Sequence, residues 1–317
     1  MINFKPVKLS DKAWMDKHFI AEDSRCCDFN FTNIFIWGDS YKLTAAEVAG
    51  MLVFRTVVNK IIYYSFPIGL GDVRAAVSEL LKHCRESKEP FNLRGITEKN
   101  AEKIDILFPC LFDFIPERSS FDYVYLAEKL ATLSGKRLHA KRNHINKFIS
   151  SYNWTFEPIT AEKVALCAAM NEEWIRRNRG AKGSPTLDSE QEALSKALSN
   201  YTALGLEGGA LFVDGEMVAF TIGEKLNSDT YVVHFEKAFR EINGSYSMIN
   251  REFVRYVMQN HPEIVYINRE DDTGAENLRR AKQSYYPEFM VEKYIAVPSK
   301  QRSAYDAVSI FSRARQT

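Results

Sequence analysis

The sequence predicts an α/β protein of two tandem domains, each with a mixed, largely antiparallel sheet flanked by helices. A short strand-like run at residues 4–7 recurs at 156–159, and each copy leads into a helix. Each half then contains hairpin-rich β-branched and aromatic runs followed by the order loop, helix, strand, helix, strand. At 317 residues, the chain also exceeds the size at which one hydrophobic core usually keeps growing. We therefore expect a first domain over residues 1–128, a basic linker helix over 129–152 and a second domain over 153–317.

The first half is expected to place a hairpin ahead of its helices. Two β-branched and aromatic runs are separated by Asn59-Lys60, and the loop Gly69-Leu70-Gly71-Asp72 precedes a long amphipathic stretch. The expected helices are 10–19, 73–86 and 99–107, and the expected strands are 50–58, 61–66, 91–93 and 121–126.

The second half repeats this order. Asp214-Gly215 indicates a tight hairpin, because both central positions of the favoured two-residue turn need positive φ. The expected helices are 161–177, 246–258 and 275–286, and the expected strands are 209–213, 217–222, 230–235, 264–267 and 289–296.

Charge and cysteine content exclude several classes of protein. The formal net charge of +1 argues against wrapping long nucleic acid, although a local basic patch remains possible. The five cysteines are odd in number and show no CxxC spacing, so neither a disulfide framework nor a metal site is expected. The sequence starts without a secretory signal and has no apolar run of the roughly 18–20 residues that a membrane span needs. We expect a cytoplasmic protein without a transmembrane segment.

Four segments resemble the phosphatidylglycerol lysyltransferase C-terminal-domain family. They are Phe31-Thr32-Asn33-Ile34-Phe35-Ile36-Trp37, the "GK…KRN.I..F" pattern from Gly135 to Phe148, the block from His234 to Phe253, and the run from Asn268 to Pro287. The resemblance implies two tandem acyl-N-acyltransferase (GNAT-like) domains, as in the Fem-type peptidyltransferases. Family members of known activity carry a multi-span membrane region ahead of this domain and move lysine or alanine from aminoacyl-tRNA onto lipid. The resemblance therefore implies an acyl group moved, with tRNA as a partner, to an amine or hydroxyl on a small molecule or lipid headgroup.

His234 and Glu236 are the candidate catalytic residues. They stand two apart on a predicted strand, so both side chains are expected on one face of the sheet. Acyl transfer to an amine needs a base and hydrogen-bond donors for the oxyanion. We predict His234 as the base and Glu236 as the residue that orients it. The alternative is a hydrogen-bonded pair at the end of a sheet.

Acidic and amide side chains follow the next strand. Asn268, Glu270 and Asp272 leave its end, near the place where such sheets splay and bind ligands. We predict that they bind substrate, including the ammonium group of an aminoacyl donor, together with Lys282 of the same segment. The alternative is helix capping, because acids before and within a first turn favour the helix dipole.

A basic helix and a glycine-containing loop are the candidate phosphate or RNA contacts. Cations without an intervening acid run from Lys136 to Lys147, and three basic positions share a face at i, i+4 and i+7. The alternative is a solvated linker helix. The predicted phosphate- or RNA-binding residues are Lys136, Arg137, Lys141, Arg142, Asn143, Gly244 and Ser245.

Three functions stay open on the sequence. The first is an aminoacyl- or acyltransferase. The second is an acyl-CoA-dependent N-acetyltransferase of a small amine. Counted from Arg240, however, Asn243 and Ser245 stand where the pyrophosphate loop of acetyl-CoA-dependent relatives has small residues, and Gly244 is the only glycine. The third is a non-catalytic module that binds RNA or another ligand. No cofactor is assigned; aminoacyl-tRNA and acyl-CoA are the donors considered.

Overall fold

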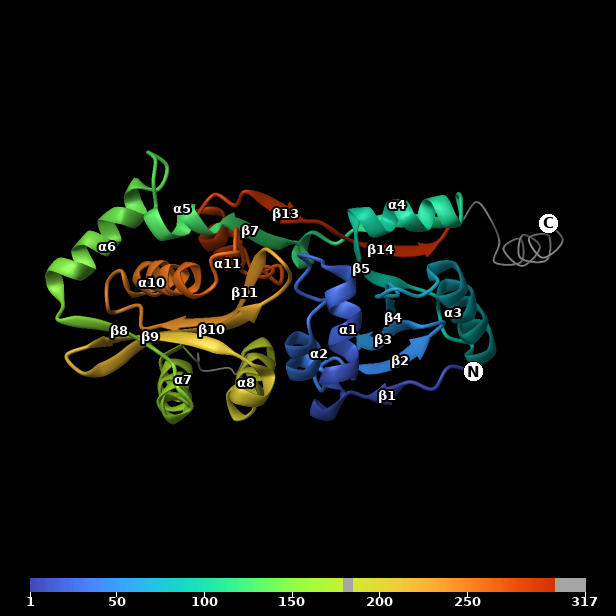
Figure 1. Cartoon of the computed structure of the whole chain (residues 1–317), viewed down its shortest axis with the longest axis horizontal. Helices are drawn as coiled ribbons and strands as arrows, with labels where there is room; N and C mark the ends of the chain where they lie inside the picture. The colour runs from blue at the N-terminus through green and yellow to red at the C-terminus, as the bar shows by residue number, and fades with distance from the viewer. Residues whose placement is uncertain (179–184, 300–317) are drawn as a thin grey trace. The chain divides into compact units, whose positions relative to one another are not determined.

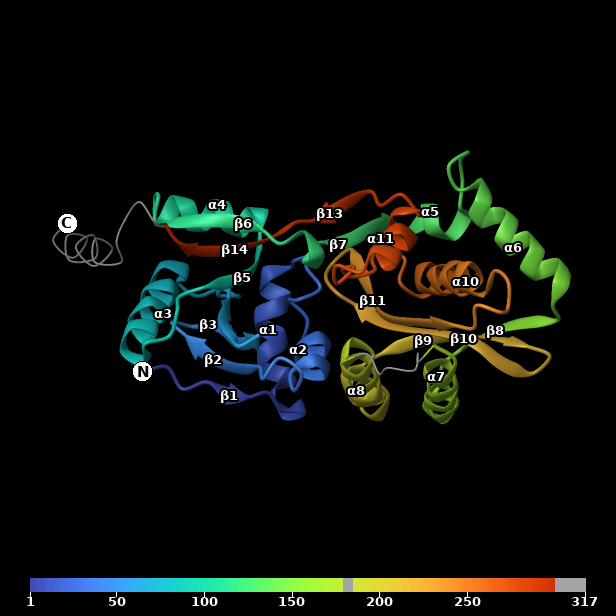
Figure 2. The ribbon, with the colours of Figure 1, turned by 180° about the vertical axis from the view of Figure 1, so that it is seen from behind.

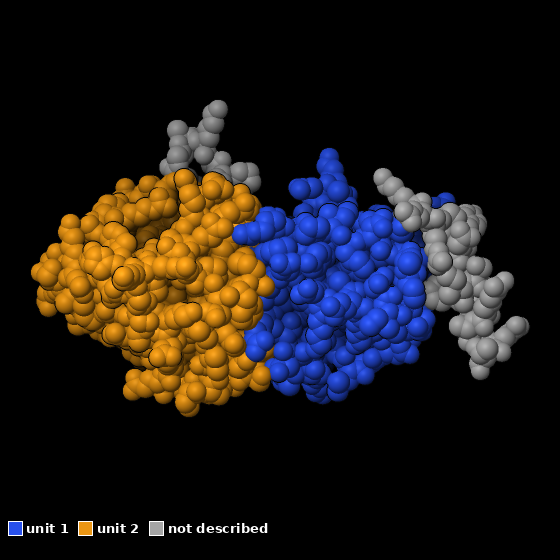
Figure 3. Space-filling view, turned by 90° about the horizontal axis from the view of Figure 1, so that it is seen from above, with its two compact units in different colours: residues 1–121, 291–317 blue, residues 122–290 orange. Residues whose placement is uncertain are grey.

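The computed structural model describes residues 1–178 and 185–299, and it confirms the α/β class. The described chain forms two seven-stranded mixed sheets flanked by helices. By their internal contacts, the described residues divide into unit 1, residues 1–121 with 291–299, and unit 2, residues 122–290 (Figure 3). Among the described residues, no helix has both the length and the apolar character that a membrane crossing requires.

The sheet of unit 1 has the strand order β1-β2-β3-β4-β5-β14-β6. Its pairs are antiparallel except β4 and β5, which run parallel. Helices α3 and α4 contribute to one core with the sheet, and on α1 the ring of Phe19 stacks on Phe54 of β3. The strands are β1 (Lys5–Pro6), β2 (Thr44–Val48), β3 (Met51–Val58), β4 (Ile61–Ser65), β5 (Leu93–Thr97), β6 (Phe112–Pro116) and β14 (Lys293–Pro298), and the helices are α1 (Lys12–Glu22), α2 (Phe31–Trp37), α3 (Val73–Ser87) and α4 (Glu98–Leu107).

The sheet of unit 2 has the order β13-β7-β12-β11-β10-β9-β8. Strands β11 and β12 run parallel. They are the fourth and fifth strands of the second half of the sequence, as β4 and β5 are of the first half. Helix α10 covers one face, and α7 and α8 lie on the other (Figures 1 and 2). The strands are β7 (Asp122–Leu126), β8 (Trp154–Pro158), β9 (Glu207–Val213), β10 (Glu216–Lys225), β11 (Thr230–Ala238), β12 (Tyr266–Asn268) and β13 (Phe289–Val291), and the helices are α5 (Ala127–Thr132), α6 (His139–Ser151), α7 (Val164–Asn178), α8 (Pro185–Ser199), α9 (Tyr201–Leu204), α10 (Ser245–Asn260) and α11 (Glu276–Gln283).

The two halves of the sequence exchange their last strands. β7, the seventh strand of the first half, lies between β12 and β13, while β14, the seventh strand of the second half, lies between β5 and β6. The compact units therefore differ from the expected domains, because residues 122–126 contribute to the second sheet and residues 293–298 to the first. The expected strand 289–296 is in fact two strands, β13 and β14, one in each sheet. Residues 300–317 of the expected second domain lie outside the described residues.

The expected linker helix over 129–152 is two helices, α5 and α6. Helix α5 ends at Leu133, which has a left-handed backbone with φ of 51°, and Gly135 follows with φ of 87°. Two closely spaced departures from helical φ break the hydrogen-bond ladder, so the chain turns before α6 begins. The expected hairpin turn is present, because Asp214 and Gly215 have φ of 51° and 87° between β9 and β10.

Candidate functional site

A β-bulge in β11 determines how the candidate residues face. In the pairing of β10 with β11, Ile222 lies opposite Phe235 and Gly223 opposite Val233, so His234 is an extra residue without a cross-strand partner. An extra residue interrupts the two-residue alternation of side chains and leaves its own backbone outside the regular ladder. The alternation that predicts a shared face for His234 and Glu236 therefore does not hold across this position.

The contacts confirm that the two side chains lie on opposite faces. Before the bulge, Val233 packs in the core cluster that contains α10. After it, Glu236 accepts a hydrogen bond from Asn250 of α10, whereas Lys237 contacts Glu190 of α8. Val233 faces α10, so its neighbour His234 faces α7 and α8 on the other side of the sheet. Glu236 faces α10. The same-face expectation was wrong.

His234 lies between two carboxylates. Its Nε2 is 3.0 Å from Oε1 of Glu224 on β10, and its Nδ1 is 2.9 Å from Oε1 of Glu270. The imidazole is 1% exposed. Burial alone lowers the pKa of His234, but the hydrogen bonds to Glu224 and Glu270 outweigh it and raise that pKa to about 9. At neutral pH the ring is therefore a cation that donates through both nitrogens and leaves the group with one net negative charge.

This protonation state bears on the predicted role of His234. An imidazolium with both N–H groups engaged has no lone pair with which to accept a proton. The geometry therefore favours a role in positioning Glu224 and Glu270 over a role as general base. For the same reason the ring offers no nitrogen to a metal ion, and no cluster suited to holding a metal is found in the described residues.

The raised pKa predicts a pH dependence of stability. Because the folded-state pKa of about 9 lies above the value of 6.5 in an unfolded chain, the stabilisation is complete below pH 6.5 and is lost as pH rises through 9. We expect the free energy of unfolding to fall by about 3 kcal/mol across this window. Urea unfolding at pH 6, 7.5 and 9.5 measures it. In His234→Gln, the fall across the window should be much smaller, and an equal fall in both proteins would contradict the assignment.

The segment after β12 is held by strand β7. Asn268 donates from Nδ2 to Oδ2 of Asp122 at 3.1 Å, and its Oδ1 accepts from the backbone N–H of Glu270 at 2.7 Å. Glu270 adopts φ of 55°, and its carbonyl accepts from the N–H of Tyr123. Asn268 therefore shapes the turn that directs Glu270 to His234. The structure brings three of the predicted residues, His234, Asn268 and Glu270, into one network.

Two other predicted substrate residues are engaged within the protein. Asp272 is fully buried and accepts from Arg279 at 2.9 and 3.1 Å, from the hydroxyl of Tyr123 at 2.6 Å and from the N–H of Gly274. Burial opposes ionisation, but these hydrogen bonds lower the pKa of Asp272 to about 2. Lys282 donates to the carbonyl oxygens of Arg269 and Asp271. Both side chains stabilise the loop before α11, although the N-cap of that helix is Ala275 and receives no side-chain hydrogen bond, so helix capping is not their role. Their predicted contact with substrate stays a prediction.

Glu236 anchors a second network on the α10 face. Its Oε1 accepts from Nη2 of Arg269 at 3.0 Å, and its Oε2 accepts from Nδ2 of Asn250 at 3.2 Å. The guanidinium of Arg269 lies 5.0 Å from the ring centroid of Tyr285. The ammonium of Lys141 lies 4.0 Å from the same centroid, which brings helix α6 to this network.

The predicted basic track is only partly available to a polyanion. Arg142 donates to the carbonyl oxygens of Leu133 and Gly135 and so closes the turn before α6. Lys141 is half-buried, whereas Lys136, Arg137, His144 and Lys147 are exposed. Asn143 is exposed and has its amide near the ring of His139. Gly244, with φ of 89°, precedes α10, and Ser245 is buried with its hydroxyl bonded to the carbonyl of Phe239.

Sequence reasoning missed four residues of these networks: Glu224, Asn250, Arg269 and Tyr285. Three of them stand inside segments already singled out by the resemblance, which was the available signal. Glu224 carried no signal, because it lies opposite Val232 and reaches His234 only through a side-chain contact between β10 and β11.

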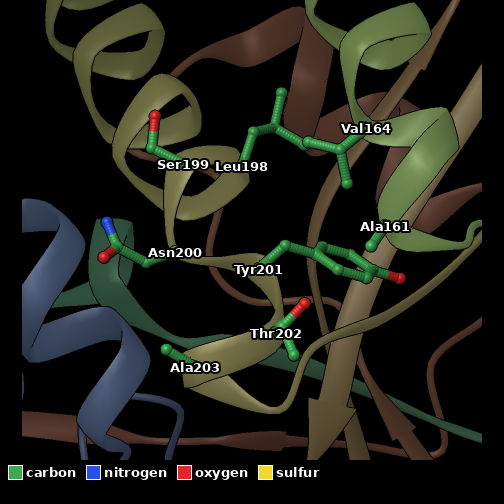
Figure 4. Close-up of a pocket in the computed structure, with 8 residues that line it drawn as sticks. All are labelled: Ala161, Val164, Leu198, Ser199, Asn200, Tyr201, Thr202 and Ala203. Carbon is green, nitrogen blue, oxygen red and sulfur yellow. The ribbon is translucent and has the colours of Figure 1, made fainter.

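A separate cavity of about 270 Å³ lies where α8, α9 and the start of α7 meet. Figure 4 shows the ring of Tyr201 between Val164 and Leu198 on one side and Thr202 on the other. None of the predicted site residues lines this cavity. We assign it no role in the candidate site.

Comparison with known proteins decides the family. Residues 22–297 match the family model described as phosphatidylglycerol lysyltransferase, C-terminal. The chain belongs to this family. The matched range contains the residues of both polar networks around β11.

Solved structures of relatives share the fold. A conserved protein of unknown function from Bacteroides thetaiotaomicron is 38% identical, with a TM-score of 0.88 over 94% of this chain and all of that chain. The L-PGS of Bacillus licheniformis is 15% identical, with a TM-score of 0.64 over 98% of each chain. FemX is 10% identical, with a TM-score of 0.56 over 95% of this chain and 98% of its own. The chain has the fold of two tandem GNAT-like domains.

A curated relative matches more locally. An uncharacterized protein of Mycoplasmoides gallisepticum is 28% identical over 190 residues. The alignment spans 57% of this chain and 57% of that protein.

Proposed function

We propose that this protein is an aminoacyltransferase that takes an aminoacyl group from aminoacyl-tRNA and passes it to an amine or hydroxyl acceptor. The observation that carries the proposal is the bulge in β11, with a negatively charged network on one face of the sheet and a positively charged one on the other. Family membership supports it, because the family is named for a lysyltransferase.

The network around His234 can meet two requirements of the reaction, which are binding of the donor ammonium and stabilisation of the oxyanion. The Glu224–His234–Glu270 group carries one net negative charge and suits the ammonium of an aminoacyl donor. The interrupted ladder at His234 is where a backbone N–H can be directed at the developing oxyanion. In the transfer, the acceptor nitrogen or oxygen forms a bond to the ester carbonyl carbon, and the bond from that carbon to the tRNA oxygen breaks. The acceptor proton passes to the leaving oxygen, with Glu270 as the proposed relay.

An exposed basic face on and before α6 is proposed to hold the tRNA acceptor end. Replacing Lys136 and Lys147 together by Ala should weaken binding of charged tRNA and lower the slope of log affinity against log salt by about two units, one for each phosphate that is no longer neutralised. Fluorescence anisotropy over a salt series measures both quantities.

A charge-matched control is available on α4 of unit 1. Lys99 and Lys103 are exposed, and replacing both by Ala removes the same charge from another surface. This control should keep the wild-type slope. Equal losses in both variants would show that only net charge matters. A wild type that binds no tRNA at low salt but is stabilised against heat by acetyl-CoA would replace this proposal with the acyl-CoA-dependent enzyme.

A further inference from the structure

The Glu236 network contains buried hydrogen-bonding atoms that the described protein does not satisfy. Glu236 uses its two oxygens to bind Nη2 of Arg269 and Nδ2 of Asn250. The other end of each partner, Nη1 of Arg269 and Oδ1 of Asn250, is buried and has no hydrogen-bond partner among the described residues. Leaving a buried donor or acceptor unpaired costs about 1–3 kcal/mol. One donor and one acceptor beside the same carboxylate are therefore both left without a complement.

A half-buried cation completes this arrangement. Lys141 packs its ammonium 4.0 Å from the ring centroid of Tyr285 and makes no hydrogen bond or ion pair with the described residues. The guanidinium of Arg269 lies 5.0 Å from the same centroid. With one carboxylate and two cations, the group has one net positive charge. Lys141 is also exposed more than Asn250, so a ligand entering from solvent meets it early.

The missing complement has a definite chemistry. It must bring anionic oxygen to Arg269 and Lys141, and an O–H or N–H hydrogen to Oδ1 of Asn250. A phosphate ester with a neighbouring hydroxyl supplies both, because its oxygens accept from cations and its hydroxyl donates. A plain carboxylate such as acetate supplies only the first.

We infer that Lys141, Arg269 and Asn250 form a binding site for a phosphate ester that carries a free hydroxyl. The inference rests on the proposed function, in which such a group belongs either to the nucleotide end of the donor or to the acceptor. It assigns no new step to the transfer. Glu236 in this site fixes Arg269 and Asn250 and is a positioning residue.

The titration of Lys141 supplies a second signature. Burial first, and the neighbouring Arg269 second, lower the pKa of Lys141 to about 8, with Glu236 partly opposing them. The phenol of Tyr285 stays neutral in this range because burial raises its pKa. Lys141 therefore loses its charge between pH 7.5 and 9.5, and affinity for the phosphate ester should fall at least fivefold over that interval. In Lys141→Arg the fall should disappear, because arginine keeps its charge.

Calorimetric titration of the full chain with sn-glycerol 3-phosphate, adenosine 5′-monophosphate and acetate tests the site. Lys141→Met removes the charge but keeps a stem to cover Tyr285, and it should bind the phosphate esters at least tenfold more weakly. Lys99→Met, on the exposed surface of α4 in unit 1, removes the same charge elsewhere and should bind them like the wild type. A preference for adenosine 5′-monophosphate points to the donor, and a preference for glycerol phosphate points to the acceptor.

The outcomes separate this inference from the proposed function. Equal affinities in the wild type and Lys141→Met, equal losses in Lys141→Met and Lys99→Met, or acetate binding as tight as phosphate-ester binding would each overturn the site. Loss of tRNA binding in the Lys136 and Lys147 variant, with phosphate-ester binding intact, leaves the site standing and tests only the basic track. Thermal melts of each variant establish that it is folded.

Discussion

Residues 1–128 and 129–317, expressed as separate chains, are each expected to be insoluble or unfolded. Cutting at the boundary that the repeat suggests removes β14 from between β5 and β6, and removes β7 from between β12 and β13. Each sheet is then deprived of an interior strand with neighbours on both sides. At about 1 kcal/mol net for each hydrogen bond, with the reduced core burial added, the cost is comparable to a total stability of about 5–15 kcal/mol.

Co-expression of the two fragments is the control, because the exchanged strands can then restore both sheets. We expect a soluble complex that co-purifies and melts cooperatively. Circular dichroism and size-exclusion chromatography of the separate and combined fragments provide the measurement. If either fragment alone melts cooperatively near the temperature of the full chain, the strand exchange is not needed for folding.

Asp272→Ala is expected to destabilise the protein by about 2–4 kcal/mol without any ligand present. The substitution leaves the buried hydroxyl of Tyr123 without its acceptor and removes the bidentate partner of Arg279. The value lies toward the low end for a broken buried pair because Arg279 is partly exposed, with 27% of its side chain accessible. Urea denaturation at pH 7 measures the change.

Asp271→Ala is the matched control in the same loop. The side chain of Asp271 accepts a hydrogen bond from the N–H of Thr273 near the surface. Its removal should cost about 0.5–1.5 kcal/mol. If Asp272→Ala keeps wild-type stability and loses only substrate affinity, Asp272 binds substrate as the sequence suggested, and the structural role is wrong.

Many local elements of this fold could be read from the sequence, although α2, α8, β2 and β6 were not among the expected helices and strands. The hairpin at Asp214-Gly215 formed because both residues accept positive φ, and the helix after Asp72 formed with that aspartate as its cap. The expected strand 289–296 and the expected helix 129–152 were each divided by the structure. The strand divides where the chain passes from one sheet to the other, and the helix divides at the positive φ of Leu133 and Gly135.

The sequence predicted several residues of the candidate site but not the faces of the sheet on which they lie. His234, Asn268 and Glu270 do share a network, whereas Glu236 belongs to a second network on the other face. One extra residue in β11 is responsible, since side chains alternate with a period of two and a single insertion reverses every later position. Asp272 and Lys282 were predicted to bind substrate; the structure shows that both are hydrogen-bonded within the protein, and the substrate role stays a prediction.

The sequence by itself determined the α/β class, the tandem repeat and the family, because hydrophobic periodicity, turn residues and motif spacing are local properties of the chain. Only the tertiary structure decided which strands pair. Ladder partners are chosen by backbone hydrogen bonds between segments far apart in sequence, and β7 and β14 fit either sheet by pattern alone. Their exchange also places Asp122 and Tyr123 of the first half against Asn268 and Asp272 of the second, so the candidate site is built from both halves of the sequence.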